Sequence, residues 1–295
     1  KLRYGENPHQ KASIYQFKKN NFLKISGKEL SYNNICDTEI AVELSEQFSK
    51  PSCVILKHGN PCGVSLATNQ ETAYSRALMC DKVSAFGGII AFNKPLSFKT
   101  ALKINKIFTE VVVAPKFSIK AKKLLSLKTN LILIEYKSSN IKTKFHIKTT
   151  QNFLLIQEKD NKTITSRDLT FKTKKPTKKL IDDMIFAFIV SKYINSNAIV
   201  LAKNLSTIAI GGGQTSRLDS AKQAIKKMKE NFKKTSSVMA SDGFFPFPDI
   251  IKLCSKNNII GVIQPGGSKN DNDVINAASK IKIPLVFTGI RHFKH

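Results

Sequence analysis

Short apolar runs alternate with amphipathic stretches along most of the chain. The runs are too short for helices and are bounded by turn-forming residues, so they predict buried strands at 53–56, 89–92, 111–113, 131–134, 198–202, 207–210, 238–240, 259–263 and 285–287. Apolar residues at helical spacing predict helices near 40–48, 71–79, 101–108, 180–189 and 218–232. Asp37 or Thr38 is the expected N-cap of the first helix. Strands that alternate with helices indicate an α/β fold with a mainly parallel or mixed sheet.

A basic, proline-containing run, KTKKPTKK at 172–179, interrupts this alternation, which then restarts. Charge runs of this kind are most often solvated linkers. A chain of 295 residues is long enough to bury a large core and to divide in two. We therefore predict two domains, 1–175 and 176–295, each a sheet flanked by helices.

The composition is that of a globular protein. Hydrophobic residues make up 41% of the chain, and the longest apolar run, 184–190, is too short to span a bilayer. The five cysteines form no CxxC pair, a pattern typical of reduced thiols in a cytoplasmic protein. No signal peptide is visible at Lys1, and the missing Met suggests a processed or excised piece.

The formal net charge is +27, from 48 basic and 21 acidic residues. Such a charge attracts anions and could serve nucleic-acid binding through phosphate contacts. The lysines are spread along the chain, however, and no aromatic RNA-binding motif accompanies them. AT-rich coding would also make Lys, Asn and Ile abundant together. We therefore expect an anionic small-molecule substrate, with nucleic acid as the less favoured partner.

The first candidate site follows the predicted strand 53–56. The strand ends in Lys57 and His58, an ammonium beside an imidazole, and GNPCG at 59–63 predicts a turn. α/β folds place catalytic groups in such loops after strands. The alternative is a surface loop that carries these two side chains by chance.

Pro61 and Cys62 in the same loop invite comparison with zinc deaminases, whose signature is H-x-E followed by P-C-x-x-C. Ser65 stands where the second Cys would be, and no H-x-E precedes it. We predict no zinc site and a structural place for Cys62 within the turn.

Two further loops contain residues suited to anions and flat rings. GGGQTSR at 211–217 is either a phosphate cradle before a helix or a tight turn that requires glycine, and it lacks P-loop or GxGxxG spacing. SDGFFPFPD at 241–249 offers rings for stacking and Asp249 as an acceptor, unless it is a hydrophobic plug between the halves. Arg3 and Arg291 suit a phosphate monoester, although terminal arginines are ordinarily solvated.

These motifs occur in the order of a known enzyme family: RYGENPHQ, SYNN, KHGNPCG, SAFGG, GGGQTSR, SDGFFPFPD and IRHFKH. From Arg3 to His295 the chain resembles the transformylase half of the bifunctional purine biosynthesis proteins. That half is 5-aminoimidazole-4-carboxamide ribonucleotide (AICAR) formyltransferase. The family's N-terminal IMP cyclohydrolase half has no counterpart in this sequence. Either it was trimmed, which the missing Met favours, or the chain works without it.

The resemblance implies two cytidine-deaminase-like subdomains without zinc, and a homodimer with active sites across its interface. It implies formyl transfer from 10-formyltetrahydrofolate to the 5-amino group of AICAR, which yields the formamido ribonucleotide (FAICAR) and tetrahydrofolate during IMP biosynthesis. A bound potassium ion is reported for some members, with ligands that this sequence does not identify.

The family's functional residues fall on positions that match its motifs. The catalytic pair falls on Lys57 and His58. The ribonucleotide contacts fall on Arg3, Tyr4, Asn34, Gly87, Asn197, Phe244 and Arg291, with the ribose contact on Glu110. The folate contacts fall on Phe86, Arg217, Phe247, Asp249 and Ser268.

The chemistry of this reaction agrees with the residue types. The attacking amine is a weak nucleophile because the ring and carboxamide delocalise its electrons, and a neutral imidazole at His58 can remove its proton. Lys57 and Asn197 are candidates to stabilise the tetrahedral oxyanion, and Lys57 could instead protonate the departing folate nitrogen. The alternatives are a basic anion- or nucleic-acid-binding protein and a catalytically dead relic, against which the intact Lys57, His58, Asn197 and Arg291 argue.

Overall fold

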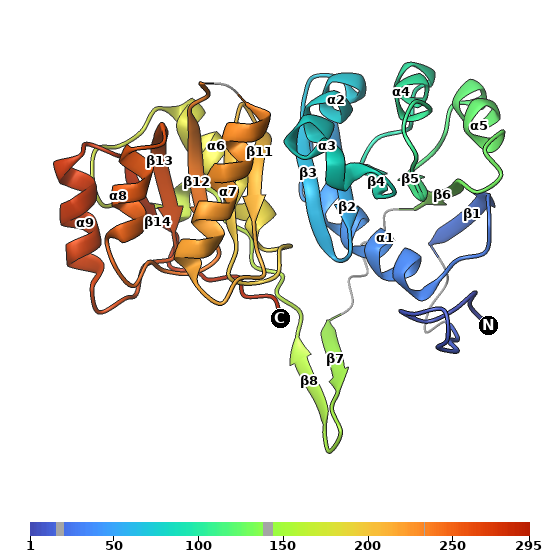
Figure 1. The fold of residues 1–295 in the computed structure, drawn as a ribbon, viewed down its shortest axis with the longest axis horizontal. Helices are drawn as coiled ribbons and strands as arrows, with labels where there is room; N and C mark the ends of the chain where they lie inside the picture. Colours follow the sequence, from blue (N-terminus) through green and yellow to red (C-terminus); the bar gives the residue numbers. More distant parts are fainter. Residues whose placement is uncertain (16–20, 138–143, 233) are drawn as a thin grey trace.

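The computed structural model describes residues 1–15, 21–137, 144–232 and 234–295 of the chain. Figure 1 shows two halves side by side, with a β-hairpin projecting below them. Each half consists of strands covered by helices, which confirms the predicted α/β architecture.

The strands of both halves form one 12-stranded sheet. In sheet order, the first half contributes β1 (Phe22–Ser26), β6 (Ile132–Tyr136), β5 (Val111–Ala114), β4 (Ile89–Phe92), β2 (Ser52–Lys57) and β3 (Asn60–Leu66). The second half continues with β11 (Ser206–Gly211), β10 (Ile199–Lys203), β12 (Ser237–Ser241), β13 (Ile259–Gln264), β14 (Leu285–Phe287) and β9 (Thr170–Phe171). The structure thus has one large sheet where the sequence predicted a sheet in each half.

The helices connect successive strands. In the first half they are α1 (Tyr32–Ser45), α2 (Gln70–Cys80), α3 (Lys82–Ala85), α4 (Phe98–Ile104) and α5 (Ile119–Ser126). In the second half a 3₁₀ turn (Ser166–Asp168) precedes α6 (Lys178–Ser191), α7 (Arg217–Asn231), α8 (Asp249–Ser255) and α9 (Asp271–Lys280). The predicted cap of the first helix was wrong, because Ser31 is the N-cap and its hydroxyl accepts from the backbone N–H of Asn34.

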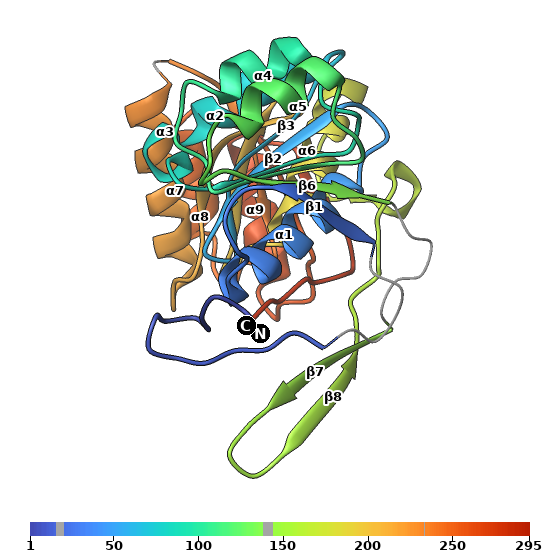
Figure 2. The ribbon, with the colours of Figure 1, turned by 90° about the vertical axis from the view of Figure 1, so that its right-hand side faces the viewer.

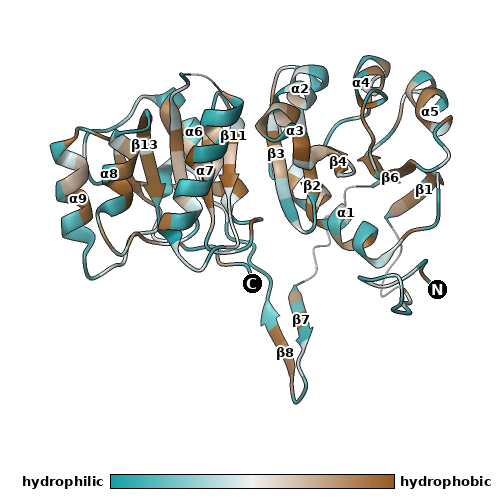
Figure 3. Cartoon of the chain, viewed as in Figure 1, coloured by the Kyte–Doolittle hydropathy of each residue, from teal (hydrophilic) through white to brown (hydrophobic). Residues whose placement is uncertain are grey.

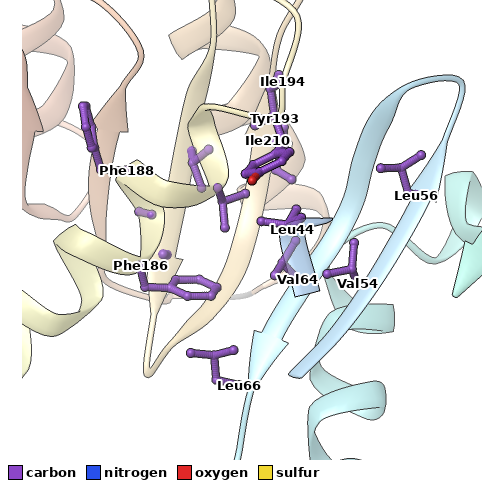
Figure 4. Packing of buried hydrophobic residues seen from close by; sticks show 14 of the residues in the cluster. Leu44, Val54, Leu56, Val64, Leu66, Phe186, Phe188, Tyr193, Ile194 and Ile210 are labelled. Atoms are coloured by element: carbon purple, nitrogen blue, oxygen red, sulfur yellow. The ribbon is translucent and has the colours of Figure 1, made fainter. Parts of the chain in front are cut away.

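Side chains alternate between the two faces of the sheet, and the faces pack differently. On one face a single apolar cluster runs beneath α1 and α6 through both halves. Figure 4 shows Leu44, Val54 and Val64 on the side of the first half and Phe186 and Ile210 on the side of the second. On the opposite face each half has its own core, under α2, α4 and α5 or under α7, α8 and α9. The shared cluster joins the halves.

The two half-sheets meet where β3 pairs with β11. Ser65 lies opposite Ser206 in an antiparallel pair, and their buried hydroxyl oxygens are 2.6 Å apart. The backbone N–H of Val64 donates to the Thr207 hydroxyl at 2.9 Å. Polar groups at the centre of the molecule therefore have partners, as buried polar groups require.

The two halves repeat one topology. The order β1-α1-β2-β3-α2-β4-α4-β5-α5-β6 matches β9-α6-β10-β11-α7-β12-α8-β13-α9-β14, with α3 as an addition in the first half. In each half the three strands after the hairpin are parallel to one another, whereas the hairpin and the edge strand are antiparallel to their neighbours. β9 precedes the predicted boundary at 175 but pairs with β14 in the second half.

Candidate functional site

The catalytic pair predicted from the sequence lies at the tight turn between β2 and β3. His58 and Gly59 are the two central residues, with φ of +52° and +72°. Positive φ at both positions is the pattern of a type I′ hairpin turn. The chain turns here, before the predicted stretch at 59–63, and β3 begins at Asn60. Cys62 therefore lies in a strand and not in a turn; burial raises its thiol pKa to about 12.

A carboxylate from α1 holds this turn from one side. Asp37 accepts from the backbone N–H of His58 at 3.0 Å and from that of Gly59 at 2.8 Å, using one oxygen for each. Burial raises the pKa of Asp37 above its ordinary value, although the two N–H groups oppose that shift. The sequence analysis missed this role because it placed Asp37 at a helix cap.

The second half holds the turn from the other side. Lys294 donates its ammonium to the carbonyl of Gly59 at 2.7 Å and to that of Tyr193 at 3.2 Å. The backbone N–H of Asn195 donates to the side-chain oxygen of Asn60 at 2.9 Å. The turn is thus an inter-half contact, which no local pattern in the sequence indicates.

The structure brings Lys57 together with the predicted Phe86–Gly87 contacts. The Lys57 ammonium donates to the Phe86 carbonyl at 2.8 Å, and a Cβ at Gly87 would lie 3.9 Å from that ammonium. Gly87 has φ of +73°, which favours glycine. The Phe86 ring is exposed and lies 5.2 Å from the ring of Phe108. His58, Lys57 and Phe86 therefore occupy one exposed region of the first half.

A second cluster forms around Asn197 and Arg217 in the second half. The Arg217 guanidinium donates to the side-chain oxygen of Asn197 at 2.6 Å, to the Ser241 hydroxyl at 2.8 Å and to the Asp242 carboxylate at 2.8 Å. Burial lowers the pKa of Arg217, and the Asp242 carboxylate opposes that shift. With a side chain only 10% exposed, Arg217 orients Asn197 and offers little surface to a ligand.

The amide nitrogen of Asn197 also has protein partners. It donates to the carbonyls of Gln214 at 3.0 Å and Thr215 at 3.2 Å. An amide has two N–H donors. Stabilising an oxyanion would therefore require Asn197 to release one of these carbonyls.

The two terminal arginines lie beside aromatic rings in different halves. Arg3 is exposed, with its guanidinium 4.7 Å from the centroid of the Tyr4 ring and 2.9 Å from the Tyr4 hydroxyl. Arg291 is exposed, with its guanidinium 4.7 Å from the centroid of the Phe293 ring. Across the described ranges, no hydrogen bond or ion pair links either arginine to the other.

The aromatic loop at 241–249 divides between core and surface. Phe245 is fully buried in the core of the second half, whereas Phe244 and Phe247 are exposed. The loop is therefore not a plug between the halves. Asp249 begins α8 and accepts from the N–H of Ile250, and the N–H of Ser268 donates to Asp271.

Two predicted ribonucleotide contacts already have protein partners. Asn34 is buried and completes the capping box of α1 by accepting from the N–H of Ser31 at 3.1 Å. Glu110 forms an ion pair with Lys28 at 2.6 Å. Both side chains therefore form contacts within the first half, one at the start of α1 and one with Lys28.

The glycine run at 211–213 serves close packing. A Cβ at Gly211 would lie 2.1 Å from the carbonyl oxygen of Ser220 in α7, and the N–H of Gly212 donates to the Gln223 side chain at 3.1 Å. The structure favours the tight turn over the phosphate cradle.

In the ranges that the structure covers, no group of three or more His, Cys, Asp or Glu side chains is placed to hold a metal ion. No helix among the described residues has the length and apolar content needed to cross a bilayer.

Comparison of the sequence with known proteins shows the family of the chain. The family model for the AICARFT/IMPCHase bienzyme matches residues 1–227. Similar proteins include the "Bifunctional purine biosynthesis protein PurH" of Caldicellulosiruptor saccharolyticus (43% identical), Thermoanaerobacter sp. (46%) and Fusobacterium nucleatum (44%). Each alignment covers 100% of this chain but 58–59% of the relative. The chain therefore belongs to the AICARFT/IMPCHase bienzyme family, and it spans less than two thirds of the length of these relatives.

Proposed function

We propose that this chain transfers the formyl group of 10-formyltetrahydrofolate to the 5-amino group of AICAR, giving FAICAR and tetrahydrofolate in purine biosynthesis. The observation that carries the proposal is the β2–β3 turn, which presents His58 next to Lys57 in the chain and is held by hydrogen bonds on both sides. The family match and the relatives named as purine biosynthesis proteins support it. IMP cyclohydrolase activity is not expected from this chain.

His58 acts as the base in this proposal. Its side chain is exposed at the tip of the turn, where a substrate amine can approach it. Removing the amine proton as the nitrogen attacks the formyl carbon avoids a high-energy ammonium intermediate.

Lys57 supplies positive charge next to the base. An ammonium has three N–H donors, and one donates to the Phe86 carbonyl. The remaining donors can serve the oxyanion of the tetrahedral intermediate or the departing folate nitrogen. Both roles stay open in the proposal.

The exposed polar and aromatic groups provide the proposed binding surfaces. Arg3, Tyr4, Gly87, Phe244 and Arg291 would contact the ribonucleotide, with its phosphate between the two arginines. Phe86, Phe247, Asp249 and Ser268 would contact the folate, whose pterin ring can stack on the exposed phenylalanines. The proposed ribonucleotide contacts also include Asn34, Glu110 and Asn197. Arg217 orients Asn197 through a hydrogen bond to its side-chain oxygen.

We further propose a homodimer, because the residues proposed for each ligand are divided between separate exposed regions of the two halves. The projecting hairpin of β7 (Phe145–Thr149) and β8 (Leu154–Glu158) supports this assembly (Figures 1 and 2). Its register places four exposed apolar side chains on one face: Phe145, Ile147, Leu154 and Ile156. Figure 3 colours much of β8 as hydrophobic. An isolated two-stranded hairpin is only marginally stable in water, so a second copy of the chain is its expected cover.

A double substitution tests the dimer. Ile147→Ser with Ile156→Ser should shift the sedimentation coefficient to that of a monomer, whereas Lys148→Ser with Gln157→Ser on the opposite face should not. A dimer that persists after the first pair would contradict this use of the hairpin.

The cytidine-deaminase-like subdomains, the cytoplasmic location and a bound potassium ion remain further parts of the proposal. The repeated topology of the halves supports two related subdomains, with the second beginning at β9 and not after residue 175. Potassium has no assigned ligands, and no step of the mechanism uses it.

The deciding experiment is a direct assay of the purified chain. Release of tetrahydrofolate from 10-formyltetrahydrofolate should depend on added AICAR, with FAICAR formed in equal amount. A folded, dimeric chain without this activity would contradict the proposal. A salt-dependent gel shift with RNA, unaffected by AICAR, would favour the alternative of a basic anion- or nucleic-acid-binding protein.

A further inference from the structure

We propose that Lys294 is a positioning residue, which fixes the backbone of the turn that presents His58. The inference rests on the formyl-transfer function proposed above, and it adds a residue that the sequence analysis did not assign. Lys294 lies in the C-terminal tail of the second half, 235 positions from the carbonyl that it contacts in the first half.

The turn lies between two opposite charges. The Asp37 carboxylate accepts from the N–H groups of His58 and Gly59, and the Lys294 ammonium donates to the Gly59 carbonyl at 2.7 Å. The peptide before Gly59 therefore gives its N–H to the carboxylate, and the peptide after Gly59 gives its carbonyl to the ammonium. Rotating either peptide would break a charge-assisted hydrogen bond.

The ammonium is held in an environment that does not favour a charge. Burial lowers the pKa of Lys294, and the carboxylate of Asp37 opposes that shift. Its two carbonyl partners, Gly59 and Tyr193, belong to different halves. Burying an ammonium costs free energy that a solvated surface position would not. We therefore attribute its position to the hydrogen bond with the turn.

The second half contains the same turn without an ammonium. Asn204 and Leu205, between β10 and β11, have φ of +52° and +56°. Asp183 of α6 accepts from their backbone N–H groups at 2.9 Å and 2.6 Å, as Asp37 does in the first half. The Leu205 carbonyl, however, accepts from the backbone N–H of Leu66 at 2.9 Å.

This repeat separates what the fold needs from what the site needs. In both turns an aspartate accepts from the two central N–H groups, and a donor from the other half binds the carbonyl of the second central residue. In the second half this donor is a neutral backbone N–H. The charged donor occurs at the turn that carries His58. A displacement of about 1 Å at a catalytic group can lower a rate on the order of 10²-fold, so a rigid turn has direct value for catalysis.

The tail remains anchored when only the ammonium is removed. The N–H of Ser196 donates to the Lys294 carbonyl at 2.9 Å, and this bond does not involve the side chain. Lys294→Met should therefore keep the course of the tail. A matched control is Lys227→Met, because Lys227 also joins the halves, through an ion pair with Asp81 at 2.9 Å, and forms no hydrogen bond with His58 or Gly59 in the described part of the chain.

The test compares formyl transfer by the two variants of the full chain. For Lys294→Met, kcat should fall on the order of 10²-fold with the KM of both substrates nearly unchanged, whereas Lys227→Met should keep the wild-type kcat. Equal kcat values for the two variants would overturn the proposal. If Lys294→Met does not fold, Lys294→Gln, which keeps a neutral donor on a shorter side chain, should lower kcat in the same direction.

A spectroscopic measurement keeps this inference distinct from the proposed function. The ¹⁵N signals of the His58 imidazole, assigned with His58→Gln, should shift or broaden in Lys294→Met and not in Lys227→Met. Perturbed signals with an inactive wild-type chain would uphold the positioning role and reject formyl transfer. An active wild type with unchanged His58 signals in Lys294→Met would reject the positioning role alone.

Discussion

The β2–β3 turn of the first half and the β10–β11 turn of the second share one backbone conformation and differ in their side chains. The first reads Lys57-His58-Gly59-Asn60 and the second Lys203-Asn204-Leu205-Ser206. Both turns follow a lysine, both have positive φ at the central residues, and both are held by an aspartate in the preceding helix. The first half places an imidazole where the second half has the amide of Asn204. The comparison teaches that the backbone of the site is a general property of the fold, and that its chemistry comes from single side chains.

The largest expected effect separates the two central residues. His58→Ala should lower kcat by about 10²–10⁴-fold because the base is lost, while folate binding remains. Asn204→Ala, at the corresponding place in the second half, should leave kcat near that of the wild type. Steady-state kinetics and fluorescence titration with folate measure both. Wild-type turnover by His58→Ala would remove the base from the mechanism.

The next effect concerns the first residue of the helix that follows each hairpin. Arg217 begins α7 and reaches Ser241 and Asp242, and Gln70 begins α2 and bonds Lys94 and Ser97 in the corresponding loop. Arg217→Met should lower the free energy of unfolding by about 3–5 kcal/mol, because it leaves the buried Asp242 carboxylate without its cationic partner.

The control for Arg217 is Gln70, whose side chain carries no charge. Gln70→Met removes two uncharged hydrogen bonds and should lower the free energy of unfolding by about 1–3 kcal/mol. Urea unfolding of both variants measures the difference. Similar losses would show that the ion pair adds little beyond hydrogen bonding.

The two turn-holding aspartates should have similar structural effects and different functional ones. Asp37→Asn and Asp183→Asn each place an amide N–H against a backbone N–H, which should lower the free energy of unfolding by about 1–3 kcal/mol. Only Asp37→Asn should also lower kcat, on the order of 10-fold to 10²-fold, because His58 lies on its turn. Equal kcat losses in both variants would indicate a general loss of folded protein.

The smallest effect is the pH dependence of stability. The pKa of Asp37 is raised on folding, chiefly by burial, so its contribution to stability is full below the ordinary pKa of 3.8 and is lost as pH rises through the folded value. The pKa of Asp81 is lowered: burial opposes the shift, but hydrogen bonds from Ser84 and Lys227 outweigh it. Its contribution is therefore present above 3.8 and is lost as pH falls through the folded value.

Variants at these positions should thus change the pH profile in opposite directions. Above pH 3.8, the stability of the wild type relative to Asp37→Asn should fall as pH rises through the folded pKa of Asp37. Below pH 3.8, the stability of the wild type relative to Asp81→Asn should rise with pH from the folded pKa of Asp81. Urea titrations at each pH provide the comparison. Slopes of the same sign would contradict the environment assigned to Asp37.

Secondary structure with a strong local pattern was predictable, and elements defined by pairing were not. The strands near 53–56 and 198–202 and the helix near 218–232 were confirmed because each has an uninterrupted apolar run or a helical spacing. β3 was missed because Pro61 and Gly63 are typical of a turn. A bulge beside Leu56 accommodates Pro61, and Gly63 lets α2 approach, since a Cβ there would lie 2.0 Å from the Ala77 carbonyl.

The sequence by itself determined the class of fold, the alternation of elements and the family, and it singled out Lys57 and His58 as the proposed catalytic pair. These features depend on residue identity and short spacing, which the chain displays directly. Only the tertiary structure decided that the half-sheets merge at Ser65 and Ser206, that the halves repeat one topology, and that Asp37 and Lys294 hold one turn from opposite sides. Such contacts join residues far apart in the chain, and nothing in the local sequence of either partner indicates the other until the sheet has formed.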